Sequence, residues 1–315
     1  MPAGVDASIL DRRLVFVTGK GGVGKTSVAA ALAQIAAERG QRTLVCEMDA
    51  KGSLADSFDV GSLTFQPRQL EPNLFGMAMN TEDALKEYLR LFAKVPLIGR
   101  IGPLARTFDF LADAAPGVRE ILVIGKLCYE VRERHYDIVI VDAEATGHII
   151  SQIGAPVTIR EMAQVGLVRE QTDWMLKVLH DSSVTGVAVV TTPEEMPVSE
   201  TLTLLERLER ETGVAPTTLV ANRVLPDLFT DRQRDIVDRL GEALPLIVGD
   251  IGRGGQAVLE ATHITEARRK IGEGHLDRLR SESDLPILTV PELFTRATGR
   301  RVVTLVADAL AGQVG

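Results

Sequence analysis

Residues 19–26 read Gly19-Lys20-Gly21-Gly22-Val23-Gly24-Lys25-Thr26, and this glycine-rich stretch decides the fold. A short apolar run, residues 14–17, precedes it. In residues 27–39, which follow, apolar side chains recur at the three- and four-residue spacing of a helix, and Gly40 is a stop signal. A strand, a glycine-rich loop and a helix in this order predict a phosphate-binding loop. We therefore expect an α/β P-loop NTPase fold.

The residue types in this loop suit ATP with its Mg²⁺ ion. Glycines allow the backbone to turn successive N–H groups toward phosphate oxygens, and the first turn of the helix adds unpaired N–H groups. Lys25 is placed to reach the β and γ phosphates, and the Thr26 hydroxyl to bind Mg²⁺. The alternative is a glycine-rich turn that binds nothing. The expected nucleotide-binding residues of the loop are Gly19, Gly21, Gly22, Val23, Gly24, Lys25, Thr26 and Ser27.

Lys20 stands directly after the first glycine of the loop. A lysine at this position resembles the deviant loop of one subgroup of P-loop ATPases, in which it crosses a dimer interface to the partner's nucleotide. The resemblance implies a catalytic role for Lys20 in trans, in addition to that of Lys25. The alternative is a solvated surface lysine.

The composition fits one domain, residues 1–315, with an insertion. The 315 residues are 45% hydrophobic, enough for one large core. Acidic residues outnumber basic ones by 43 to 35, and the resulting net charge of -8 disfavours a broad nucleic-acid footprint. Residues 1–13 are charged and no apolar run reaches the length of a membrane span, so neither a signal peptide nor a transmembrane helix is expected. Any membrane contact would be peripheral.

The two cysteines, Cys46 and Cys128, have no His or Cys neighbours at metal-ligand spacing. We therefore expect no zinc site, and a reducing cytoplasm fits this cysteine usage.

Short apolar runs alternate with helical patterns along the chain. Strands are expected at residues 43–46, 74–79, 138–141, 186–190 and 218–221, with a crossover helix over residues 197–212. This alternation predicts a doubly wound, mostly parallel sheet flanked by helices.

Two stretches interrupt this alternation of strands and helices. Residues 81–126 are expected to form a helical insertion, either a hairpin covering the sheet or a surface that docks a partner. Residues 149–181 carry Trp174 and Met175 on an expected helix, with core packing as the favoured role.

Several polar residues follow the expected strands. Asp142 closes an apolar strand, where a buried carboxylate is costly without a metal or hydrogen bonds, so we expect it to hold Mg²⁺ through water. Gly147 could offer its N–H to the γ phosphate. Asp49 could orient the attacking water, with Glu47 as the alternative and a metal outer-shell residue or loop cap as the other interpretation of Asp49. Asn222 could pair with adenine through its amide, or simply form a turn.

These residues together resemble the anion-transporting ATPase family, which includes the arsenite-pump ATPase and the ATPase that targets tail-anchored membrane proteins. The resemblance implies a nucleotide-sandwich dimer in which Asp49 positions water and the Asn222 and Pro291 regions line the adenine. The matching residues are Gly19 to Thr26, Asp49 with Leu54, Asp56 and Phe58, Pro116-Gly117, Asp142 with Thr146-Gly147-His148, and Asn222.

The chain also departs from the family pattern. After its strand aspartate the family usually has Thr-Ala-Pro, whereas this chain has Ala143-Glu144-Ala145. Two distant cysteines cannot supply three soft ligands for arsenite.

From the glycine-rich loop and the family resemblance together, we expect a dimeric cytoplasmic ATPase, with itself or a related ATPase as partner subunit. We expect this ATPase to couple nucleotide state to a protein or membrane partner. The alternatives are a positioning ATPase of the septum-site or plasmid-partition kind and a weakly hydrolysing structural subunit.

Overall fold

The computed structural model describes residues 8–49, 51–92, 117–162 and 165–314. Within these residues eight strands form one sheet in the order β3-β4-β2-β5-β1-β6-β7-β8, and every pair except β3 with β4 is parallel. The expectation of a doubly wound, mostly parallel sheet is confirmed. The strands are β1 (Leu14–Gly19), β2 (Thr43–Glu47), β3 (Arg68–Glu71), β4 (Leu74–Ala78), β5 (Ile138–Ala145), β6 (Thr185–Thr191), β7 (Thr218–Val224) and β8 (Ile287–Pro291).

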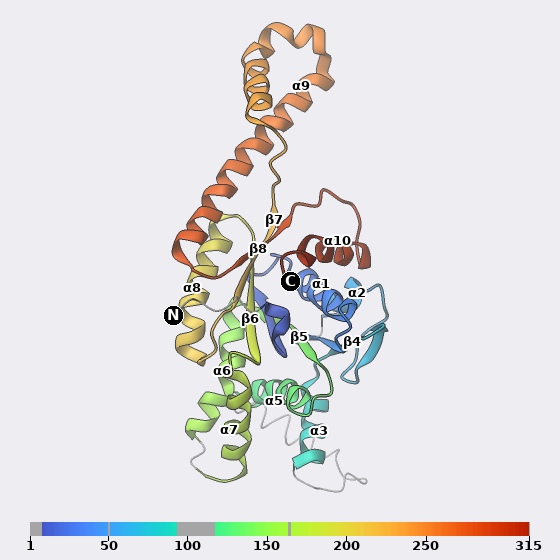
Figure 1. The fold of residues 1–315 in the computed structure, drawn as a ribbon, viewed down its shortest axis with the longest axis vertical. Helices are drawn as coiled ribbons and strands as arrows, with labels where there is room; N and C mark the ends of the chain where they lie inside the picture. The colour runs from blue at the N-terminus through green and yellow to red at the C-terminus, as the bar shows by residue number, and fades with distance from the viewer. Residues whose placement is uncertain (1–7, 50, 93–116, 163–164, 315) are drawn as a thin grey trace.

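Helices cover both faces of this sheet, as Figure 1 shows. On one face pack α1 (Lys25–Glu38), α2 (Ser53–Ser57) and α10 (Arg300–Ala311), and on the other α5 (Val118–Arg132), α6 (Thr146–Met162), α7 (Leu167–Leu179) and α8 (Glu195–Thr212). A single 3₁₀ turn, η1 (Ile9–Asp11), precedes β1.

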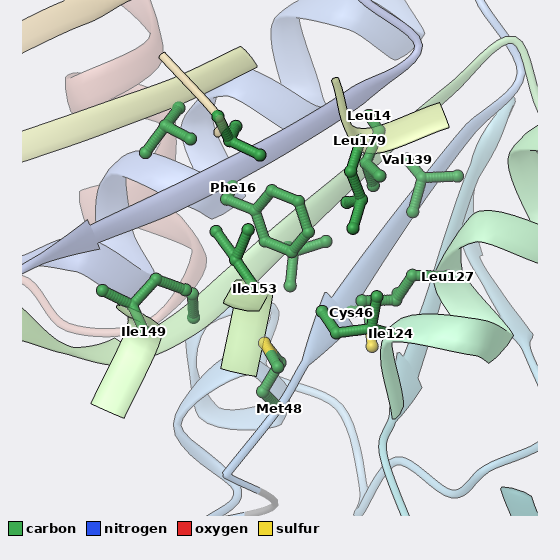
Figure 2. Close-up of a cluster of buried hydrophobic side chains, with 14 of the residues drawn as sticks. Leu14, Phe16, Cys46, Met48, Ile124, Leu127, Val139, Ile149, Ile153 and Leu179 are labelled. Carbon is green, nitrogen blue, oxygen red and sulfur yellow. The ribbon is translucent and has the colours of Figure 1, made fainter. Parts of the chain in front are cut away.

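β1 lies at the centre of the sheet, between β5 and β6. Its side chains alternate between the two layers of core: Leu14 and Phe16 join the cluster under α5 to α8, and Val15 and Val17 join the cluster under α1 and α10. Figure 2 shows Phe16 among side chains of the first cluster. Because all four side chains are fully buried, the strand that leads into the glycine-rich loop is held from both sides.

α1 begins at Lys25, two residues earlier than the expected start, so that Lys25 and Thr26 belong to its first turn. Every residue from 28 to 37 is buried, which explains the alanine-rich sequence: the helix lies against the sheet on one side and α10 on the other.

The expected helical insertion is described only at its two ends. α3 (Thr81–Phe92) packs against α5, and residues 93–116 of the predicted insertion lie outside the described residues. The stretch over residues 149–181 forms parts of α6 and α7, where Met175 and Leu176 are buried in agreement with a core-packing role.

The largest element absent from the sequence prediction is α9 (Asp231–Glu282), which projects from the sheet as an arm in Figure 1. A capping box between Thr230 and Gln233 starts it. Arg234 Nε lies 3.2 Å from Glu266 Oε2, although 32 residues of straight helix would separate them by about 48 Å. The arm therefore folds back on itself, and its returning limb packs against α8.

β3 was also absent from the prediction. It is a four-residue antiparallel edge strand whose side chains are exposed or half-buried, so its sequence carries no apolar run. No helix among the described residues has both the length and the apolar character needed to cross a bilayer.

Candidate nucleotide-binding site

The glycine-rich loop joins β1 to α1 at the carboxyl edge of the sheet. Gly24 has φ +94°, and a Cβ there would lie 2.3 Å from Asn222 Nδ2. A Cβ at Gly19 would lie 2.1 Å from the carbonyl oxygen of Val190. Glycine is therefore required at both ends of the loop, by backbone angle and by close approach. Gly21 and Gly22, between them, are exposed and face open space, which leaves the loop backbone accessible to an anion.

Asn222 braces this loop from the end of β7. Its Nδ2 donates to the Val23 carbonyl at 2.8 Å, and its Oδ1 accepts the Arg223 N–H at 2.9 Å. The side chain is buried. The adenine contact predicted for Asn222 remains a prediction, and the loop brace is a contact that the sequence did not reveal. Pro291 ends β8 and pairs with Val224 of β7, so both residues expected near adenine lie at one corner of the sheet.

Thr26 and Asp142 meet under the loop. Thr26 Oγ1 donates to Asp142 Oδ2 at 2.7 Å, and Asp142 Oδ1 is buried with no hydrogen-bond partner among the described residues. Burial raises the pKa of Asp142 to about 6, against the lowering effects of the Thr26 hydrogen bond and the Lys25 charge. A hydroxyl beside a carboxylate with one unused oxygen is a donor set that suits Mg²⁺.

Lys25 lies half-buried beside the same carboxylate. Its Nζ donates to the Lys20 carbonyl at 3.3 Å. Burial lowers the pKa of Lys25, an effect that the charge of Asp142 opposes. The ammonium group is thus at the mouth of the loop, where the predicted phosphates would lie.

The two carboxylates considered for orienting water lie in different surroundings. Asp49 is exposed, in the loop between β2 and α2, and forms an ion pair with Lys51. Glu47 is 2% exposed, and its oxygens accept the backbone N–H groups of Gly52 and Ser53. Of the two, only Asp49 has a carboxylate that is exposed to solvent.

Lys20 and Gly147 both lie beside Glu200 of α8. Lys20 Nζ is 2.5 Å from Glu200 Oε1, an ion pair that the sequence did not indicate. Gly147, in the first turn of α6, lines with Glu200 a hollow of about 290 Å³ between α6 and α8. Where β5 meets α6, the Glu144 carboxylate accepts from Gln152 Nε2 at 2.7 Å, and the Glu144 carbonyl accepts from Thr18 Oγ1 at 2.8 Å.

Comparison with known proteins gives the class to which this fold and site belong. The model of the Anion-transporting ATPase family matches residues 12–172 and 151–239. The chain belongs to this family, as its sequence motifs predicted. The matched residues include the glycine-rich loop, Asp49, Asp142, Gly147 and Asn222, whereas β8 and the returning limb of α9 lie beyond them.

Individual relatives point the same way. The chain is 33% identical over 226 residues to ATPase BagA of Mycobacterium tuberculosis, covering 68% of this chain and 66% of that protein. It is 27% identical over 248 residues to a putative arsenical pump-driving ATPase of Halobacterium salinarum, covering 70% of this chain and 37% of that protein. It is 33% identical over 148 residues to ATPase ASNA1 homolog 1 of Paramecium tetraurelia, covering 45% and 43%. The chain therefore spans about two thirds or less of the length of these relatives.

Proposed function

We propose that this chain binds MgATP at the glycine-rich loop and hydrolyses it as part of a dimer. The observation that carries the proposal is the Thr26–Asp142 contact beneath the glycine-rich loop, together with the second Asp142 oxygen, which has no hydrogen-bond partner within the described ranges. Membership of an ATPase family supports the same proposal.

The chain's residues divide the proposed work as follows. The loop N–H groups of residues 21–26 and the Lys25 ammonium bind the phosphates. Thr26, and Asp142 through water, would hold Mg²⁺, which would supply positive charge to the phosphate oxygens. Asp49 orients the attacking water, and Gly147 offers its N–H near the γ phosphate. Lys20 leaves Glu200 and reaches the nucleotide of a second subunit, either a copy or a related ATPase.

A second feature of the fold, an apolar hollow between helices, suits the binding of a partner protein. α3, α5, α6 and α7 enclose a hollow of about 380 Å³ whose lining is mainly apolar and includes Leu85, Leu89, Ile121, Leu122 and Trp174. Such a hollow suits an apolar segment of a partner protein. Arsenite is not proposed as cargo, because Cys46 and Cys128 are fully buried and burial raises the pKa of both thiols. A cytoplasmic location belongs to the same proposal.

The test is ATP binding by calorimetry together with phosphate release in Lys25→Ala and its parent. We expect Lys25→Ala to lose binding at least tenfold, because it removes the charge that contacts the phosphates. Lys86→Ala, an exposed lysine on α3, is the control and should bind as the parent does. Equal affinity in Lys25→Ala and the parent would remove the proposed site.

A nucleotide-binding subunit with little turnover is the second candidate. It is favoured by Glu144, which stands where the family usually has the middle residue of Thr-Ala-Pro and whose carboxylate accepts a hydrogen bond from Gln152. Tight ATP binding without phosphate release, in the presence of Mg²⁺, would select this candidate over the first.

A further inference from the structure

Glu47 is a buried carboxylate that the proposed chemistry leaves without a role. It ends β2 and lies beside Asp142 of β5 in the register of the sheet. A carboxylate that is only 2% exposed is costly unless hydrogen bonds compensate for its lost hydration. No cation forms an ion pair with it among the described residues.

The compensation comes from the start of α2. Glu47 Oε1 accepts the Ser53 N–H at 2.9 Å, and Oε2 accepts the Gly52 N–H at 3.2 Å. Gly52 itself has φ +86°, a left-handed turn that aims two successive N–H groups at one carboxylate. Both oxygens of Glu47 thus accept a backbone N–H, and the buried side chain joins the end of β2 to the start of α2.

These contacts close the loop that carries Asp49. The loop leaves β2 at Met48, whose N–H donates to the Asp142 carbonyl at 3.1 Å, and it ends where Glu47 holds Gly52 and Ser53. Asp49 has its described side-chain contact only with Lys51 of the same loop. The position of the Asp49 carboxylate therefore depends on the loop backbone. This backbone is hydrogen-bonded on both sides of Asp49, at Met48 to Asp142 and at Gly52 and Ser53 to Glu47.

We propose that Glu47 is a positioning residue for hydrolysis: by holding the N-terminus of α2, it fixes the loop that presents Asp49 to the attacking water. In this role Glu47 acts through the loop backbone and not on the nucleotide itself. This inference rests on the proposed function, because positioning matters only if Asp49 acts on ATP.

Glu47→Gln is the sharpest test, because it keeps the shape of the side chain but turns an N–H₂ group toward one of the two backbone donors. We expect at least a tenfold loss of kcat at saturating MgATP, with the Kd for ATP within threefold of the parent. Hydrogen exchange of the peptide covering residues 48–57 should accelerate at least tenfold in the variant. Glu130→Gln is the matched control: Glu130 is a buried carboxylate of α5 bonded to Lys126 and His135, away from the loop.

The control separates positioning from a general loss of stability. Glu130→Gln should lower Tm as Glu47→Gln does, yet keep kcat per nucleotide-binding site. Suppose that the parent hydrolyses ATP and that Glu47→Gln has the same kcat, or unchanged hydrogen exchange over residues 48–57. This result would overturn the positioning role of Glu47 and leave the proposed hydrolysis standing. A parent without turnover would instead overturn the proposed hydrolysis, and the positioning role with it.

Discussion

Thr26 Oγ1 donates a 2.7 Å hydrogen bond to Asp142 Oδ2, and this contact joins the first turn of α1 to the carboxyl end of β5. The two residues are 116 positions apart in the chain. They lie on neighbouring elements because β1 and β5 are adjacent and parallel, with Val17 opposite Asp142. The Thr26 hydroxyl donates to one oxygen of the carboxylate, and the other oxygen is buried with no hydrogen-bond partner in the described part of the chain.

The pH dependence of stability should report this arrangement. The Asp142 carboxyl has a pKa of 3.8 as a free group and of about 6 in the folded, metal-free protein, mainly through burial. The folded state thus holds this proton more tightly than the unfolded state, so the stabilisation is present below about pH 4 and is lost as the pH rises through about 6. The loss for this group should be about 3 kcal/mol. Urea unfolding of parent and Asp142→Asn, between pH 4 and 7 without Mg²⁺, measures it as a difference. Parallel pH curves for the two proteins would contradict the burial of an ionised Asp142.

The two ends of the glycine-rich loop should differ from its middle in their tolerance of a methyl group. Gly24→Ala places a Cβ against Asn222 and forces alanine to a positive φ, so we expect it to lower the free energy of unfolding by about 1–3 kcal/mol. Gly21→Ala meets no atom within 4 Å and should change it by less than about 0.5 kcal/mol. Chemical denaturation without nucleotide gives both values. Equal losses in the two variants would mean that Asn222 does not crowd Gly24.

Removal of the Asp49 carboxylate should separate binding from turnover. Asp49→Asn keeps the size of the side chain but weakens its ability to orient water, so kcat should fall at least tenfold while ATP affinity stays within threefold. Calorimetry and phosphate release measure the two quantities. If turnover were the same in both proteins, the role would pass to Glu144, the carboxylate at the junction of β5 and α6.

The ion pair of Lys20 with Glu200 should affect association rather than stability, because both side chains are partly exposed. Lys20→Ala should abolish ATP-dependent dimers if this lysine reaches the partner's nucleotide. Glu200→Gln frees Lys20 and should lower the ATP concentration needed for dimers by severalfold. Analytical ultracentrifugation with and without MgATP reports both effects. A parent that shows no nucleotide-linked association would remove the trans role of Lys20.

The sequence was sufficient for the parts of the fold that depend on local pattern. The buried parallel strands read as apolar runs, and the loop before Lys25 has a spacing that few other structures use. β3 was missed because an exposed edge strand has no such run. α9 was missed because glycines and Pro245 interrupt its helical pattern, although Thr230 and Gln233 form a capping box that could have marked its start.

The candidate site was predicted residue by residue but not contact by contact. Asn222 reaches Val23 across 199 positions and Lys20 reaches Glu200 across 180, and no local pattern encodes such pairs. Glu47 is different, because its partners lie five and six residues away. A buried strand-end carboxylate followed by a glycine and a short helix was a signal that could have been read.

The central place of β1 also sets the order in which the molecule can be built. β1 is complete at Gly19, but the strands on its two sides end at Ala145 and Thr191. At a synthesis rate of about 5–20 residues per second, the ribosome needs roughly 6 to 25 s to reach the end of β5 and roughly 9 to 34 s to reach the end of β6. Until then the corresponding edge of β1 lacks its partner strand. The glycine-rich loop can thus reach its folded surroundings only long after its own synthesis, although its sequence is among the first to be made. Under the proposed function, ATP would bind the folded loop and not the unfolded chain, and by mass action it would stabilise the folded protein.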